Sequence, residues 1–258
     1  MPSKEASPVL EFLDVSKVFG RHRVIDHQTF TVHAGEIFVI IGPSGTGKSV
    51  SLKLASGQLM PTEGDVRVLG TSLVDASTKT LEALRQRMGY LFQSGALLGW
   101  KTLRENVALP LEVRGKMKPK AIAEAVTKAL EDVGLGAAGD RYPAEVSGGM
   151  VKRAAFARAI VEHPELLFFD EPTSGLDPVM ARTIDDLITQ INQKYGAACV
   201  VVTHDLAGAL RYAHRIAFLK EGRFLEVSTP QAILSSQQPD IQAFLAAQSM
   251  EAKYVTST

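Results

Sequence analysis

The feature that most constrains this chain is a glycine-rich octapeptide of the form G-x-x-x-x-G-K-[ST]. An apolar β-branched run at 37–41 precedes it and is typical of a buried strand, and an amphipathic stretch at 50–57 follows it and indicates a helix. A strand, a glycine loop and a helix in this order form an anion site, because N–H groups at the helix start point at phosphate oxygens. The octapeptide consists of Gly42, Pro43, Ser44, Gly45, Thr46, Gly47, Lys48 and Ser49.

The residue types in this loop predict separate roles in binding a nucleotide with Mg²⁺. The glycines allow close approach of the backbone and positive φ angles. Lys48 is long enough to reach the β and γ phosphates, and the Ser49 hydroxyl is a suitable Mg²⁺ ligand. Val50, where the expected helix begins, completes the predicted nucleotide-binding loop.

Composition limits the possible partners. The 258 residues are 45% apolar, enough for one large domain or one domain with an inserted subdomain. Basic and acidic residues number 28 each, and this neutral balance argues against nucleic acid as the main partner. The sole cysteine, Cys199, lies in an apolar run and is expected to be a core residue in a reducing cytosol.

Residues 1–9 lack the apolar region of a signal peptide, and no apolar run approaches the ~20 residues that span a bilayer. We therefore expect any association with a membrane to be peripheral and to depend on a partner protein.

Strand and helix patterns alternate along the chain, which predicts a mainly parallel, three-layer α/β core. Residues 101–160 are mostly helical in pattern and indicate an insertion. A turn is expected at Gly20-Arg21, and a short amphipathic segment at 241–247. The other expected strands are 9–15, 25–32, 63–70, 88–92, 166–169, 199–202 and 216–219, and a helix is expected at 179–194.

Two acids, Asp170 and Glu171, end the apolar strand at 166–169, and buried strands rarely carry charge without a purpose. In a phosphate-loop protein, an aspartate at such a strand end can hold Mg²⁺ through water. The next acid can polarise the attacking water as a general base. We assign Asp170 to the metal and Glu171 to the water; the alternative is a capping acid pair in the turn before Pro172.

Together with further motifs in a fixed order, these residues resemble the ATPase subunits of ABC transporters over nearly the whole chain. Ser147-Gly148-Gly149 and the helical pattern at 152–159 resemble the family signature loop and its helix. In the family, this loop contacts the γ-phosphate that the other subunit holds, so the resemblance implies that Ser147, Gly148 and Gly149 bind ATP.

Four more residues match the motifs of this family. Gln93 matches the glutamine of the Q-loop, with an implied role in catalysis and at Mg²⁺, and His204 matches the catalytic switch histidine. Asp177, in the sequence Ser-Gly-Leu-Asp, matches the D-loop, and Phe19 stands where the family stacks an aromatic ring on adenine. The resemblance implies ATP as the nucleotide.

One position departs from the usual LSGGQ signature, because Met150 stands where the family has glutamine and cannot donate an amide hydrogen bond. Ser-Gly-Gly-Met, the Lys-Arg pair that follows, and the segment 91–97 resemble the ATPases of MCE-type lipid transporters. The segment 239–245 is similar to theirs as well.

The resemblance implies an α/β P-loop NTPase with a three-layer core, an antiparallel β subdomain and an inserted α-helical subdomain. It places the ATPase domain at 9–236, with the helical subdomain at about 94–165, and a tail at 237–258. A homodimer is expected to drive an integral-membrane permease, docked near Gln93 and the segment 94–102, at the cytoplasmic face of the bacterial inner membrane. Phospholipids or related lipids, and further MCE-type subunits, are the expected cargo and partners.

Two alternatives remain open from the sequence. The chain can serve an ABC importer or exporter for another small solute, which uses the same ATPase with a different partner. It can also be a soluble ABC ATPase that acts on ribosomes or DNA. The single phosphate loop, the absence of a heptad run and the neutral charge argue against this second class.

Overall fold

The computed structural model describes residues 8–255 of this protein. The chain forms two compact units, the first made of residues 8–76 and 200–255 and the second of residues 77–199. Helices and strands alternate in both, so the expected mixed α/β composition is confirmed. Within the described residues, no helix combines the length and the hydropathy that crossing a membrane would need.

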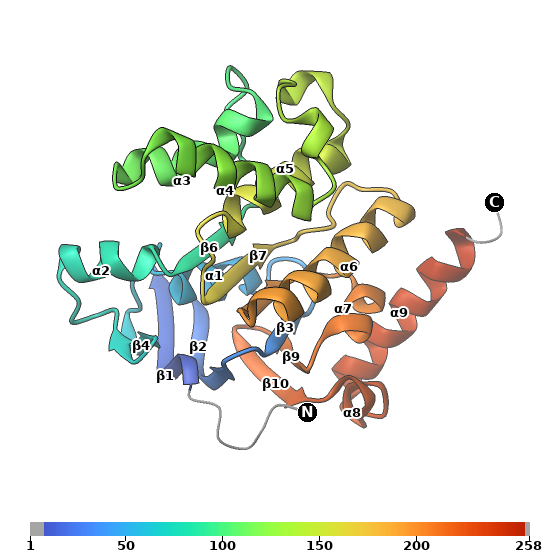
Figure 1. Ribbon diagram of the computed structural model, residues 1–258. Helices are drawn as coiled ribbons and strands as arrows, with labels where there is room; N and C mark the ends of the chain where they lie inside the picture. Colours follow the sequence, from blue (N-terminus) through green and yellow to red (C-terminus); the bar gives the residue numbers. More distant parts are fainter. Residues whose placement is uncertain (1–7, 256–258) are drawn as a thin grey trace. The chain divides into compact units, whose positions relative to one another are not determined.

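The first unit contains an antiparallel sheet in the order β2-β1-β4-β5 (Figure 1). Phe19 pairs with His22 across a hairpin, which confirms the turn expected at Gly20-Arg21. A second set of strands in this unit pairs β3 with β9 in parallel and β9 with β10 in antiparallel fashion. The strands are β1 (Pro8–Phe19), β2 (His22–His33), β3 (Ile37–Ile41), β4 (Glu63–Val68), β5 (Thr71–Ser72), β9 (Arg215–Lys220) and β10 (Arg223–Ser228).

Aromatic rings hold the interior of the first unit together. The Phe30 ring lies 4.4 Å from that of Phe12 and 5.1 Å from that of Phe38, centroid to centroid, and thereby joins β1, β2 and β3. The Phe244 ring meets the Phe218 ring edge-on at 5.3 Å, which fastens α9 to β9. The helices are α1 (Lys48–Ala55), α7 (Leu206–Tyr212), α8 (Pro230–Leu234) and α9 (Pro239–Val255).

The second unit is built from two parallel strands and a set of helices. Leu91 of β6 pairs with Phe169 of β7, so the two strands end side by side. Helix α3 begins at a capping box formed by Thr102 and Glu105, and it packs against α4 and α5. The elements are α2 (Thr78–Arg85), β6 (Met88–Leu91), α3 (Leu103–Arg114), α4 (Pro119–Asp132), α5 (Gly148–Ile160), β7 (Leu166–Asp170) and α6 (Pro178–Tyr195).

Strand β8 (Ala198–Val202) crosses the boundary between the two units. All five of its residues are buried, including Cys199, so the expected core position of this cysteine is confirmed. Burial raises the pKa of the Cys199 thiol to about 12, which keeps it protonated and unreactive at neutral pH.

Some element boundaries differ from those expected. The helix after the glycine loop runs from Lys48 to Ala55 and not from 50 to 57, because Gly47 in a left-handed conformation already starts it. Strand β10 and helix α2 were not predicted, since β10 is half exposed and α2 buries only Leu84. The segment expected at 241–247 belongs to a helix of 17 residues, α9.

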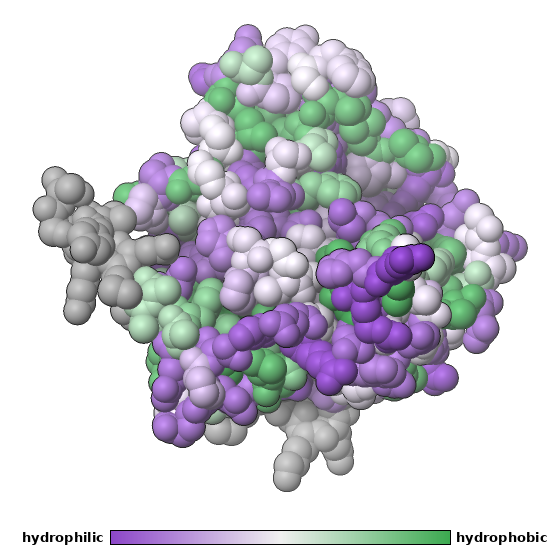
Figure 2. All heavy atoms as spheres, turned by 180° about the vertical axis from the view of Figure 1, so that it is seen from behind, coloured by the Kyte–Doolittle hydropathy of each residue, from purple (hydrophilic) through white to green (hydrophobic). Residues whose placement is uncertain are grey.

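The molecular surface in Figure 2 shows mostly hydrophilic residues, with hydrophobic residues in smaller separate areas. Exposed apolar side chains scattered in this way are normal for a folded protein. Large exposed apolar residues include Trp100, Val113 and Val179.

We expect Phe156→Ala to lower the free energy of unfolding by about 3–5 kcal/mol. Phe156 is fully buried, and its ring lies 5.0 Å from that of Phe169, so its loss leaves a cavity between α5 and β7. Urea denaturation followed by circular dichroism measures the effect. Val113→Ala on α3 is the control, because this side chain is 83% exposed and its removal should leave the midpoint unchanged. Equal midpoints for both variants would contradict the packing described.

Candidate nucleotide-binding site

The glycine loop between β3 and α1 adopts a backbone that other residues would not tolerate. Gly42, Gly45 and Gly47 have φ angles of 150°, 78° and 103°. A Cβ on Gly42 would lie 2.2 Å from the Leu219 carbonyl oxygen, and one on Gly47 would lie 2.8 Å from Cδ1 of Ile25. The glycines therefore serve both purposes expected of them, positive φ and close backbone approach.

Lys48 folds back over this loop. Its Nζ donates to the carbonyl oxygens of Gly42 at 2.8 Å and Pro43 at 2.9 Å, and the side chain is buried. Thr46 donates from its hydroxyl to the same Pro43 oxygen at 2.9 Å. The first turn of α1 carries Ser49, which is partly exposed. A cation and the start of a helix thus lie together at the loop, the arrangement that attracts a phosphate.

His204 lies close to the start of the loop. The backbone N–H of Thr203 donates to the Ile40 carbonyl at 3.1 Å, which ties the residue before His204 to the end of β3. The residue after it, Asp205, caps α7 by accepting from the N–H of Gly208 at 2.9 Å. These two anchors fix the backbone on both sides of the exposed His204.

Phe19, the residue predicted to stack on adenine, ends β1 in the same unit. Its side chain is 46% exposed, and the Lys17 ammonium lies 5.2 Å from the centre of its ring. An exposed ring of this kind can receive a flat base, and this suits the predicted role.

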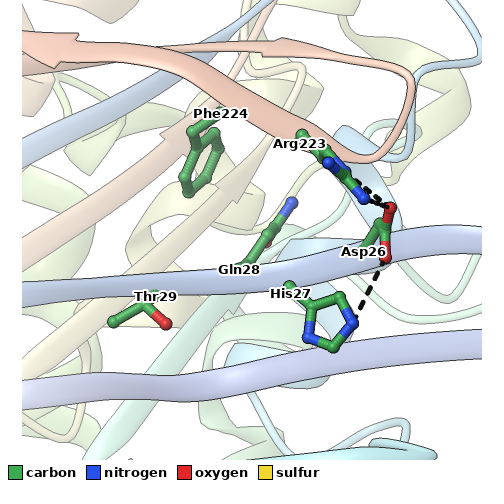
Figure 3. Close-up of a pocket in the computed structure, with 6 residues that line it drawn as sticks. All are labelled: Asp26, His27, Gln28, Thr29, Arg223 and Phe224. Carbon is green, nitrogen blue, oxygen red and sulfur yellow. Dashed lines mark hydrogen bonds and ion pairs between the residues drawn. The ribbon is translucent and has the colours of Figure 1, made fainter.

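A pocket of about 440 Å³ lies beside β2 and β10 in the first unit (Figure 3). Asp26 accepts from Arg223 at 2.6 Å on its wall, and this hydrogen bond lowers the pKa of the Asp26 carboxyl against the opposing effect of burial. Gln28 donates to the Gly222 carbonyl at 3.2 Å and accepts from the Ser51 hydroxyl of α1 at 3.1 Å. The wall of this pocket therefore braces the helix that follows the phosphate loop.

In the second unit, the paired ends of β6 and β7 bring the acids and the predicted Q-loop together. Asp170 is buried at the last position of β7, and its Oδ2 accepts from the Tyr90 hydroxyl at 3.4 Å. Glu171 follows with φ of 47°, a left-handed conformation that is uncommon outside glycine. Gln93, two residues after β6, donates from Nε2 to the Ser174 hydroxyl at 3.4 Å.

Lys152 of α5 reaches the same place. Its Nζ donates to the backbone carbonyl of Gln93 and, at 3.4 Å, to that of Glu171. Burial lowers the pKa of the Lys152 ammonium, while the nearby charges of Glu171 and Asp170 act in the opposite direction. Lys152 supported the resemblance to the signature helix and to the subfamily, and this contact was not predicted from the sequence.

The signature loop and the D-loop each begin a helix in the second unit. Ser147 caps α5 by accepting from the Met150 N–H at 3.3 Å. Gly148 is exposed, whereas Gly149 is buried, and a Cβ there would lie 2.4 Å from Cε of Met180.

Asp177 caps α6, since its Oδ1 accepts from the N–H groups of Val179 and Met180, each at 3.0 Å. Capping is therefore a role of this residue that the sequence motif did not indicate. Its predicted contact with ATP stays a prediction.

Comparison with known proteins identifies the family. Residues 25–174, more than half of the chain, match the ABC transporter family. The chain belongs to this family. It is 37% identical over 237 residues to the intermembrane phospholipid transport system ATP-binding protein MlaF of Escherichia coli, covering 92% of this chain and 88% of that one.

Other relatives carry different names. The probable ribonucleotide transport ATP-binding protein mkl of Mycobacterium tuberculosis is 39% identical over 92% of this chain, which spans 66% of that relative. The methionine import ATP-binding protein MetN of Latilactobacillus sakei is 40% identical over 94% of this chain and 71% of its own length.

A solved structure of a dimeric ATP-binding cassette, in a post-hydrolysis state with ADP and Pi, matches with a TM-score of 0.79 and 30% identity. The match covers 86% of this chain and 98% of that one. The fold is therefore that of an ABC ATPase cassette, and the expected fold class and family are confirmed.

We expect Gly47→Ala to abolish ATP binding or weaken it by at least about tenfold, because the loop can no longer hold φ of 103° against Ile25. Titration calorimetry with ATP measures the affinity. Gly99→Ala is the matched control, since a Cβ there meets no atom within 4 Å and its φ is ordinary. Unchanged affinity in Gly47→Ala would show that the nucleotide binds elsewhere.

Proposed function

We propose that this chain hydrolyses ATP to power a bacterial ABC transporter that moves phospholipids or related lipids between membranes. The observation that carries the ATPase assignment is Glu171, a carboxylate placed directly after a buried strand and beside the buried Asp170. Membership of the ABC transporter family supports the same reaction.

The residues present suit ATP with Mg²⁺. Lys48 and the N–H groups at the start of α1 would hold the phosphates, and Phe19 would stack on adenine. Ser49, Gln93 and Asp170 offer oxygen atoms, which Mg²⁺ prefers as ligands. When bound, the ion neutralises charge on the phosphate oxygens.

Glu171 would act as the general base that polarises the attacking water, and His204 and Gln93 would assist at the γ-phosphate. A carboxylate can accept the proton of a water within hydrogen-bond reach, and a positioned base contributes on the order of 10²–10⁴-fold to a rate. This contribution is what substitution of the carboxylate should remove.

We expect Glu171→Gln to lose on the order of 10²–10⁴-fold in kcat and to keep its affinity for ATP, because the amide is similar in shape but not basic. A coupled phosphate-release assay and calorimetry give the two quantities. Glu82→Gln on α2 is the control, since this glutamate is exposed. Near-wild-type hydrolysis in Glu171→Gln would contradict the assigned base.

The working unit is proposed to be a homodimer in which Lys48 of one chain and Ser147 of the other enclose each ATP. The solved cassette structure that matches this chain is dimeric, which supports the proposal. ATP would then favour the closed dimer, and loss of the γ-phosphate would let it open. Asp177 is proposed to approach the nucleotide in the closed state only.

The loop at 94–102 is a suitable contact for a permease. Asn106 holds it from α3, accepting from the Leu98 N–H at 2.7 Å and donating to the carbonyls of Leu98, Lys101 and Thr102. Trp100 in this loop is 76% exposed, although its backbone is fixed on both sides. A rigid loop that presents a large aromatic side chain is typical of a protein contact site.

The lipid assignment rests on the sequence around two loops. Met150 in the signature, the Lys-Arg pair after it and the segment 91–97 are the features that resemble lipid-transport ATPases. The relative named for intermembrane phospholipid transport supports this choice. The relatives named for methionine and ribonucleotide transport make a small-solute transporter the second candidate. In either case the chain would sit at the cytoplasmic face of the inner membrane, held by the permease and, in the lipid case, by further MCE-type subunits.

We expect the chain, purified with its membrane partners in detergent micelles free of added lipid, to show ATPase activity that rises when phospholipid is supplied. Methionine and ribonucleotides, added to the same preparation, should leave the rate unchanged. The complex with Glu171→Gln should retain bound phospholipid, detectable by mass spectrometry of the extracted lipids. Stimulation by methionine or a ribonucleotide alone would favour the second candidate.

A further inference from the structure

Helix α5 carries a buried ammonium that the proposed function does not use. Lys152 is 6% exposed, and its Nζ donates to the carbonyls of Gln93 and Glu171. These carbonyls belong to two separate loops, one after β6 and one after β7. Burying a lysine is costly unless the charge is compensated. Its place between these two loops therefore calls for a functional explanation.

Ser174 closes the arrangement into a ring. Its N–H donates to the Glu171 carbonyl at 3.2 Å, and its hydroxyl accepts from Nε2 of Gln93 at 3.4 Å. Gln93 and Glu171 are therefore joined twice, once through Lys152 and once through Ser174. Because of these two links, a displacement of the loop that carries Gln93 would also displace the backbone of Glu171.

The backbone of Glu171 needs such support. Its φ of 47° is unfavourable for a residue with a side chain, and conformations of this kind persist only where the surroundings hold them. The ammonium of Lys152 donates a hydrogen bond to the Glu171 carbonyl oxygen, and the charges of Glu171 and Asp170 favour the protonated form of this lysine. Lys152 therefore supports the backbone of this loop.

We propose that Lys152 is a positioning residue that fixes the Glu171 backbone against the Gln93 loop, so that the carboxylate of Glu171 points at the attacking water only when that loop is in place. The proposal rests on the proposed function, because it assumes that Glu171 is the base. It adds a link within one chain. Lys152, on the signature helix, connects the Gln93 loop, which is next to the proposed permease contact, to the residue that carries the proposed base, Glu171.

The test compares Lys152→Met, which removes the ammonium and keeps most of the side-chain volume, with Lys152→Arg and Lys120→Met. For Lys152→Met we expect kcat to fall by about 10- to 100-fold with an unchanged KM for ATP, since small misplacement of a catalytic group costs this much. Lys152→Arg keeps the charge and the N–H donors and should recover part of the loss. Lys120→Met, on an exposed position of α4, should behave as wild type.

Hydrogen exchange of the protein without nucleotide provides a readout independent of activity. In Lys152→Met, backbone amides at 92–98 and 170–176 should exchange faster, whereas those of α3 and α4 should not change. A merely structural role in packing α5 would instead raise exchange throughout α5 and lower thermal stability, without a selective fall in kcat.

Wild-type kcat in folded Lys152→Met, or a fall in kcat without faster exchange in the two loops, would overturn the proposal. If Lys152→Met does not fold, the same two measurements are made on Lys152→Gln, because the glutamine side chain carries no charge and is polar enough for this site. Absence of ATP hydrolysis by the wild type would refute the proposed function instead. The hydrogen-exchange comparison would then still test whether Lys152 holds the two loops.

Discussion

The rest of the structure depends on the sharp change of chain direction between β3 and α1. A fully buried strand of five residues ends just before Gly42, where the Leu219 carbonyl leaves no room for a side chain, and Gly47 caps the start of α1 in a left-handed conformation. Between them, the backbone has to expose its N–H groups and still remain packed. Only glycine at these positions satisfies both demands. The packing that requires glycine there therefore also sets the backbone conformation of the predicted ATP site.

Helix α5 organises the second unit in a comparable way through its cations. Lys152 donates to the carbonyls of Gln93 and Glu171, Arg153 to those of Val133 and Gly134, and Arg158 to those of Gly95 and Ala96. Loop carbonyls that no strand or helix can satisfy thus find donors on one helix. The signature loop caps the same helix at Ser147, so the loop expected to meet ATP and the loop expected to meet the permease share one rigid support.

Motifs with a strong local pattern could be predicted from the sequence, and contacts between distant segments could not. The buried strands β3 and β7, the turn at Gly20-Arg21 and the apolar face of α4 follow from periodicity and turn residues. Strand β10 escaped prediction because its register comes from β9 and its side chains are half exposed. The roles of Tyr90 and Lys152 were missed because each depends on a partner far away in the sequence, Asp170 and Gln93 respectively. The role of Asn106 was missed although its partners lie within eight residues, because they belong to a loop without a repeating pattern.

Two buried lysines show how the same interaction can serve different ends. Lys48 donates to two carbonyls of its own loop, so its ammonium stays where the phosphates are expected. Lys152 donates to carbonyls of two loops that are 78 residues apart (171 minus 93), so its ammonium joins them. A cation that contacts one loop is suited to bind a ligand, whereas a cation that contacts two loops is suited to transmit the position of one to the other. The chain uses lysine for both tasks because three N–H donors on a flexible stem can satisfy several carbonyls at once.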